Sequence, residues 1–292
     1  MDIRASLMGF AFAAMWSSAF TSARIIVTAA PPLSALALRF LISGLIAVAL
    51  ARALGQSWQL TRPQWRATIV FGICQNALYL GLNFVAMQSV EASLAAIIAS
   101  TMPLMVAFAG WAIFGERLPV MGVLGLVAGV AGVSVIMGAR LSGGMDPVGV
   151  ALCVVGSASL AAATLSLRQA SSGGNMLMVV GLQMLVGAAV LAVPAGFETH
   201  VVEPSWALFW AFLYTTLVPG LAATLVWFWL VDRIGAVRAA TFHFLNPFFG
   251  VAIAAVLLGE ALGPLDAIGV AIIAGGILAV QLARARVRRA AV

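Results

Sequence analysis

Two amides and a phenol recur at helical spacing in one apolar stretch of the 292-residue sequence. Gln75, Tyr79 and Asn83 are each four residues apart, so an α-helix places them on one face. Such side chains could bind the polar ends of a small molecule. They could equally hydrogen-bond neighbouring helices, as polar residues in membrane bundles commonly do. The sequence leaves both interpretations open.

A second polar face surrounds a proline. His243, Asn246, Pro247 and Gly250 follow the i, i+3, i+4, i+7 spacing of one helix face. Pro247 has no N–H, so the carbonyl of His243 must find another partner or a wet cavity. His243 is the only histidine within an expected membrane span, which makes it the remaining candidate for proton coupling. A packing role for its ring is equally compatible with the sequence.

Small polar and aromatic residues on other apolar runs complete the candidate site. Aromatic walls can hold the apolar part of a ligand or attract a cation, although each ring could instead face lipid or pack. Prolines within the runs are expected to act as hinges. The candidate substrate-binding residues are Trp16, Ser17, Gln75, Tyr79, Asn83, Ser100, Thr101, Ser157, Trp227, His243, Phe244 and Asn246, and the candidate hinge residues are Pro103, Pro247, Pro219 and Gly220.

The elements that carry these residues must be membrane helices. Hydrophobic residues make up 63% of the sequence and charged residues 8%, against about 25% in a soluble domain. The mean hydropathy of +1.12 also excludes a disordered chain. The net charge of +6 comes from arginines scattered between apolar runs, without the clustering typical of nucleic-acid binding. We therefore expect a lipid bilayer and a small-molecule substrate as partners, no nucleic acid, no cofactor and no metal.

The apolar runs predict ten transmembrane helices, each close to the roughly 20 residues that cross a bilayer. Breaks rich in glycine and proline separate them. The expected spans are 5–27, 33–53, 66–87, 92–113, 119–139, 147–168, 174–195, 206–231, 236–258 and 264–285. The expected fold is thus an all-α membrane protein.

Arginine placement predicts the orientation of these spans, because cytoplasmic loops are rich in basic residues. With a cytoplasmic N-terminus, twelve of the fifteen arginines lie inside: Arg4, Arg52, Arg62, Arg66, Arg117, Arg168, Arg233, Arg238, Arg284, Arg286, Arg288 and Arg289. Both termini are therefore expected in the cytoplasm. Of the other three, Arg39 lies deepest in a span. It is expected to pair with an outer acid such as Glu91 or Glu260, or to attract a carboxylate to the outer vestibule.

The sequence also repeats itself at an offset of 144 residues. Gly115-Glu116 recurs as Gly259-Glu260, and Pro103 recurs as Pro247. Each copy holds five expected helices, so the second copy enters the membrane in the opposite sense. The predicted domains are a first repeat at 1–140, an inverted second repeat at 145–286 and a basic cytoplasmic tail at 287–292. Inverted repeats in secondary transporters place the substrate near the membrane midplane.

This pattern resembles a known family. Two five-helix copies, each with a proline in the fourth helix and a Gly-Glu-x-Leu turn before the fifth, are similar to the two EamA repeats of the drug/metabolite transporter superfamily. The overall pattern is most similar to its YddG-type exporters of aromatic and other amino acids. The resemblance implies export across the bacterial inner membrane through a central cavity, by alternating access of the two repeats.

The acidic residues bear on how transport is driven. All nine lie at termini, loops or helix ends, which disfavours a carboxylate proton relay and favours uniport down the substrate gradient. An alternative is a broad-specificity drug or organic-cation efflux carrier coupled to protons through His243. A remote alternative is an intramembrane enzyme, for which Ser157 and His243 are the only candidate dyad and no acid supports the histidine.

Glycine-rich runs at 119–139 and 264–285 predict close helix contacts. They could form a packing seam within one chain or a homodimer interface. A working monomer is compatible with either.

Overall fold

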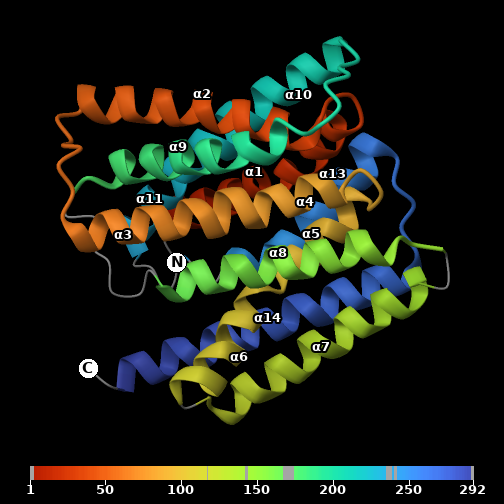
Figure 1. The fold of residues 1–292 in the computed structure, drawn as a ribbon. Helices are drawn as coiled ribbons and strands as arrows, with labels where there is room; N and C mark the ends of the chain where they lie inside the picture. The colour runs from red at the N-terminus through yellow and green to blue at the C-terminus, as the bar shows by residue number, and fades with distance from the viewer. Residues whose placement is uncertain are drawn as a thin grey trace. The chain divides into compact units, whose positions relative to one another are not determined.

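The computed structural model describes residues 3–116, 118–141, 144–166, 174–234, 239 and 242–290. Three of the arginines used to predict orientation, Arg117, Arg168 and Arg238, lie outside these residues. All of the regular structure in the described ranges is helical (Figure 1). The expected all-α architecture is therefore confirmed.

The described residues of the first half form eight helical segments. They are α1 (Ile3–Val27), α2 (Pro32–Ala53), α3 (Arg62–Phe71), the π-helix η1 (Gly72–Tyr79), α4 (Leu80–Ala86), α5 (Ala92–Ser100), α6 (Met102–Phe114) and α7 (Val120–Leu141). In the second half the described segments are α8 (Pro147–Ser166), α9 (Met176–Ala195), α10 (Trp206–Leu217), the π-helix η3 (Val218–Ala222), α11 (Ala223–Ile234), the 3-10 helix η4 (Phe242–Leu245), α13 (Asn246–Leu258) and α14 (Pro264–Ala290).

Nine stretches of helix within the described residues are long and apolar enough to cross a membrane, and Phe242–Leu258 is a shorter apolar one. These ten correspond to the ten expected spans. Of the expected span 236–258, the structure describes residue 239 and residues 242–258, and the latter begin with η4.

Four expected spans are interrupted within the described residues, and prolines stand at three of the interruptions, one of them Pro247 where η4 meets α13. Pro103 lies in the first turn of α6, directly after the break at Thr101 that ends α5. Pro219 lies within the π-helix η3. A proline has no N–H to donate and its ring displaces the preceding turn, so the backbone changes its hydrogen-bonding pattern there. The π-helix η1 contains no proline.

Helix starts repeat at the same offset as the sequence. The pairs α1 and α8, α2 and α9, α3 and α10, α6 and α13, and α7 and α14 each begin 144 residues apart. The turns agree as well: α6 ends at Gly115 with φ +64°, and α13 ends at Gly259 with φ +68°. Glycine adopts this left-handed cap without the steric cost of a Cβ, which explains why it recurs at both positions.

The chain forms two compact units that cut across the repeats. Unit 1 comprises Met1–Thr21, Ser89–Val150 and Ala222–Val292, and unit 2 comprises Ser22–Gln88 and Ala151–Leu221. Within unit 1, α7 packs along α14 and α5 along α13; within unit 2, α2 packs along α9 (Figure 1). Each unit therefore joins helices of the first half to helices of the second, and the pairs α7 with α14 and α2 with α9 are also counterparts in the repeats.

Reciprocal glycine contacts hold α7 to α14 in unit 1. A Cβ added to Gly125 would lie 2.7 Å from the carbonyl oxygen of Gly276, and one added to Gly132 would lie 2.8 Å from that of Gly269. The offset of 144 makes Gly125 the counterpart of Gly269, and Gly132 that of Gly276. The offset of 144 therefore converts each of these two contacts into the other, as a two-fold axis between the helices would. The glycine-rich runs form a packing seam within one chain.

Candidate functional site

Four rings gather in unit 1 around Phe12 of α1. The ring centroid of Phe12 lies 5.8 Å from that of Trp16, 4.7 Å from that of Trp227 and 5.3 Å from that of His243. The rings of Trp227 and His243 are 5.2 Å apart. We call these four residues the aromatic cluster. It brings together three predicted site residues from α1, α11 and η4.

Phe12 is a member that the sequence reasoning missed, although it precedes Trp16 by four residues and so shares its helix face. Phe244, which was predicted as part of the aromatic wall, is half-buried on η4. It does not belong to the aromatic cluster.

Polar groups border the aromatic cluster on the side of α13. Nδ2 of Asn246 lies 3.0 Å from Nδ1 of His243, a geometry in which a neutral imidazole accepts from the amide. The hydroxyl of Ser17 donates to the backbone oxygen of Asn246 at 3.1 Å. Oδ1 of Asn246 is buried and has no hydrogen-bond partner among the described residues. Because a buried acceptor without a donor is costly, this atom is a natural place for a ligand donor.

The remaining predicted residues of unit 1 have local roles at helix breaks. The hydroxyls of Ser100 and Thr101 donate to the carbonyls of Ala96 and Ile98 on their own helix, at 2.6 and 2.7 Å. Pro103 and Pro247 stand in the first turns of α6 and α13. These residues shape the two breaks. Gly250 faces α5, where an added Cβ would lie 2.5 Å from Cβ of Ala96.

The amide and phenol stripe lies in unit 2, on η1 and α4. Nδ2 of Asn83 donates to the backbone oxygen of Tyr79 at 2.8 Å, and Nδ2 of Asn76 donates to the backbone oxygen of Gln183 on α9 at 2.9 Å. Asn76, Tyr79 and Asn83 are 3%, 2% and 0% exposed, whereas Gln75 is only half-buried. A π-helix bonds i to i+5, so its wider turn shifts Gln75 relative to the face that α-helical spacing predicts.

Ser157 also lies in unit 2, on α8. Its hydroxyl donates to the carbonyl of Cys153 at 2.9 Å, so its proton is engaged within its own helix. His243 is engaged with Asn246 in unit 1. No group of three metal-ligating side chains occurs in the part of the chain that the structure describes.

A buried arginine faces the proline-containing π-helix of unit 2. Arg39 of α2 is 5% exposed, and its guanidinium carbon lies 5.2 Å from the centroid of the Phe40 ring. A Cβ added to Gly220 of η3 would lie 3.6 Å from Nη2 of Arg39. Within the described residues, Nε of Arg39 has no hydrogen-bond partner.

Glu260, one of the two acids expected to pair with Arg39, serves another purpose. Its carboxylate accepts the backbone N–H groups of Ala92 and Ser93, at 2.8 and 2.9 Å, at the first turn of α5 in unit 1. The pairing of Arg39 with Glu260 expected from the sequence is therefore not found. The physical reason is that the N–H groups exposed at a helix start attract a carboxylate.

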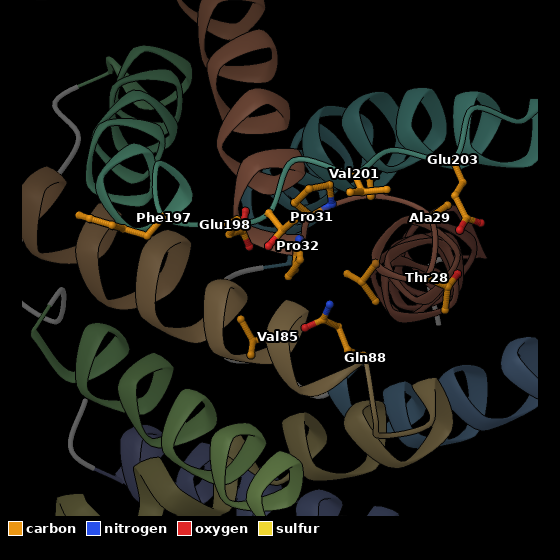
Figure 2. A pocket seen from close by; sticks show the side chains of 13 residues that line it. Thr28, Ala29, Pro31, Pro32, Val85, Gln88, Phe197, Glu198, Val201 and Glu203 are labelled. Carbon is orange, nitrogen blue, oxygen red and sulfur yellow. The ribbon is translucent and has the colours of Figure 1, made fainter.

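Unit 2 also contains a hollow of about 550 Å³ at the end where α2 begins (Figure 2). The turn at residues 27–32, the end of α4 and the loop at 197–203 line it. The carboxylate of Glu198 accepts the N–H groups of Leu33 and Ser34 at 2.9 and 2.8 Å. The N–H of Glu203 donates to the oxygen of Ala29 at 2.8 Å. Glu198 thereby fixes the loop to the start of α2, a site the sequence reasoning did not identify.

Nine apolar helices of membrane-spanning length in the described residues, with polar and aromatic groups buried between them, define a multi-pass helical membrane protein built from two repeats. The sequence model of the EamA-like transporter family matches residues 3–138 and 147–282. The chain therefore belongs to this family of membrane transporters.

Several relatives share nearly the whole chain. The uncharacterized transporter YvbV of Bacillus subtilis is 28% identical and aligns over 85% of this chain and 82% of its own. The uncharacterized inner membrane transporter YedA of Escherichia coli is 27% identical over 94% of this chain and 90% of its own. A crystal structure of a protein 25% identical in sequence matches with a TM-score of 0.69, over 97% of this chain and 99% of the other.

Proposed function

We propose that this transporter exports amino acids, with aromatic and other neutral ones favoured, and related small metabolites. The observation that carries the proposal is the aromatic cluster with the unpartnered Oδ1 of Asn246 at its border. Rings supply an apolar wall for a side chain and attract an ammonium group through their faces. Oδ1 can accept a hydrogen bond from the same ammonium.

Alternating access would use the helix breaks. Pro103 and Pro247 begin α6 and α13 at equivalent positions of the two repeats, and Pro219 and Gly220 interrupt the span that runs through η3. A break lacks part of the helical hydrogen-bond ladder, so bending there costs less than bending an intact helix. The repeats then rock around these four residues and expose the site to each side in turn.

Uniport is the mode that the carboxylates support. Glu198 and Glu260 accept backbone N–H groups at the starts of α2 and α5. Asp146 accepts the N–H of Val148 at the start of α8. The hydroxyl of Ser89 also donates to Asp146, at 2.6 Å, and this hydrogen bond lowers the pKa of the Asp146 carboxyl. The side-chain oxygens of these three acids are engaged by N–H groups at helix ends. They are poor proton carriers for a transport cycle.

The proposed setting is the bacterial inner membrane, with both termini in the cytoplasm and the second repeat inverted. In that orientation the starts of α2 and α5 face outward, together with Glu198 and Glu260. The likeness to YedA, which is named an inner membrane transporter, supports this location. The arginine distribution supports the orientation.

A second candidate is efflux of organic cations coupled to protons through His243. The position of His243 within the aromatic cluster favours it, because rings attract cations and the imidazole can exchange a proton.

Counterflow separates the two functions. Proteoliposomes loaded with unlabelled phenylalanine should accumulate labelled phenylalanine, and loading with a quaternary ammonium compound should not drive this accumulation. Accumulation of a labelled quaternary ammonium compound against the same unlabelled compound, without accumulation of labelled phenylalanine, would favour the cation carrier.

A further inference from the structure

The hollow at the start of α2 has no part in the proposed function. Its volume of about 550 Å³ falls within the range of small-molecule pockets. All of the residues that line it belong to unit 2, and none of them is a candidate substrate-binding residue. The hollow is therefore a cavity distinct from the aromatic cluster of unit 1.

Part of the wall of the hollow is apolar. Val27, Pro31 and Pro32 are buried, and Val85, near the end of α4, is half-buried. The loop at 197–203, which lines the hollow as well, is fixed to the start of α2 by two backbone hydrogen bonds. A ligand with a small apolar body can pack against this wall.

The charged groups that line the hollow are both acidic. They are Glu198 and Glu203, and no basic residue lines it in the part of the chain that the structure describes. Arg24 of α1 is not part of the lining, and its guanidinium donates to the backbone oxygen of Met87. A hollow with apolar walls and charges of one sign concentrates ions of the opposite sign. The lining therefore favours a cation.

The polar groups of the hollow can accept hydrogen bonds from such a cation. Oε1 of Glu198 accepts one bond, from the N–H of Leu33, whereas Oε2 accepts two, from the N–H and the hydroxyl of Ser34. Because each carboxylate oxygen has two lone pairs, Oε1 keeps one acceptor position. The carboxylate of Glu203 is exposed and has no hydrogen-bond partner among the described residues. Figure 2 shows the side chain of Gln88, whose amide oxygen is a further acceptor, extending toward Pro32.

These acceptors select among cationic ligands. A primary ammonium group has three N–H donors, whereas a quaternary ammonium group has none. An amino acid or a phosphatidylethanolamine headgroup also has a primary ammonium group, but each brings an anionic group for which the lining has no basic residue. The ligand that fits best is thus a cation without an acidic group.

We propose that the hollow binds a soluble primary amine with a small apolar substituent. The carboxylates of Glu198 and Glu203 attract the ammonium group, the amide oxygen of Gln88 accepts one of its N–H groups, and the substituent packs against Pro31 and Pro32. This site goes beyond the proposed function and does not depend on it. A failure to transport amino acids in proteoliposomes would leave the site standing.

Thermal unfolding of the purified protein in an uncharged maltoside detergent measures binding, because a ligand that binds the folded state raises the unfolding temperature. Benzylammonium should raise this temperature in a saturable manner. Benzyltrimethylammonium, which keeps the charge and lacks N–H groups, should need at least about fivefold higher concentrations, the worth of one hydrogen bond. Benzyl alcohol should have no effect. Equal effects of the two cations, or no effect of benzylammonium, would overturn the proposal.

Two variants at exposed positions of the lining locate the bound amine. Gln88→Lys places an ammonium group of the protein in the hollow and should abolish the effect of benzylammonium. Glu203→Gln removes one charge at nearly constant size and should raise the half-maximal concentration about two- to fivefold, as expected for an exposed charge pair. Glu116→Gln, which removes an exposed carboxylate from unit 1, is the matched control and should respond like the wild type. Responses of Gln88→Lys and Glu203→Gln that equal the response of this control would refute the site.

Nanodiscs distinguish a soluble amine from a lipid headgroup. The half-maximal concentration of benzylammonium should be the same in nanodiscs of phosphatidylethanolamine and of phosphatidylcholine. A value several-fold higher in phosphatidylethanolamine would show that the lipid ammonium group competes for the hollow, and would overturn the assignment to a soluble amine.

Discussion

Gly125 of α7 and Gly276 of α14 meet backbone to backbone. A Cβ added to Gly276 would lie 2.6 Å from the carbonyl oxygen of Gly125, and one added to Gly125 would lie 2.7 Å from that of Gly276. The two helices can approach this closely only because neither position has a side chain. The internal repeat relates this contact to the one between Gly132 and Gly269.

Gly276→Val should therefore push α7 and α14 apart. We expect the free energy of unfolding to fall by about 2 kcal/mol or more, as in other overpacked interiors. Thermal unfolding of the purified protein measures it. Gly275→Val is the control, because a Cβ at Gly275 meets no atom within 4 Å. Equal stability of the two variants would show that the glycine contact is not needed.

Glu260→Ala should destabilise the start of α5. The carboxylate of Glu260 satisfies the N–H groups of Ala92 and Ser93, and losing a cap of this kind costs about 1–2 kcal/mol. Glu203→Ala removes an exposed carboxylate and keeps the backbone bond to Ala29, so it serves as the control. A loss of stability that is no larger for Glu260→Ala than for Glu203→Ala would refute the capping role.

Phe12→Leu should weaken transport of aromatic substrates. The ring of Phe12 touches three other rings, and each aromatic pair is worth about 0.5–1.5 kcal/mol. We expect KM for tryptophan to rise about tenfold, and KM for alanine to rise less. Phe10→Leu is the control, since Phe10 is 48% exposed and contacts only the edge of Phe242 among the described rings. A uniform change for both substrates would reduce Phe12 to a packing residue.

The helices and turns could be predicted from the sequence because their signals are local. Gly115 and Gly259 mark left-handed helix caps at positions 144 residues apart, and both glycines have the positive φ that such caps require. Apolar runs of membrane length indicate helices without any knowledge of their neighbours. Even so, a single run does not reveal whether its backbone is α-helical or π-helical, as at Gly72–Tyr79.

The site was harder to predict because its residues meet across distant parts of the sequence. Phe12 became a candidate only when its ring was found against Trp227, more than two hundred positions away. Charge alone predicted Glu260 as a partner of Arg39. In the structure the Glu260 carboxylate instead accepts a hydrogen bond from an N–H group at the start of α5. Arg39 of α2 lies close to Gly220 of η3, although the two residues are far apart in the sequence.

The proposed orientation predicts which loops face outward. A cysteine at position 203 (Glu203→Cys) should react with an impermeant maleimide in intact cells, and a cysteine at position 59 (Gln59→Cys) should react only after permeabilisation. Cys74 and Cys153 are free thiols, so both are first replaced by alanine. Labelling in the reverse order would place the termini outside the cytoplasm and refute the proposed topology.

The central claim is that substrate moves down its own gradient without proton coupling. The direct measurement is the initial rate of labelled phenylalanine uptake into proteoliposomes, with and without a pH gradient, for the wild type and for His243→Asn. For each of the two proteins, we expect the same initial rate with and without the pH gradient. Uptake by the wild type that requires the pH gradient, and whose pH dependence disappears in His243→Asn, would contradict it.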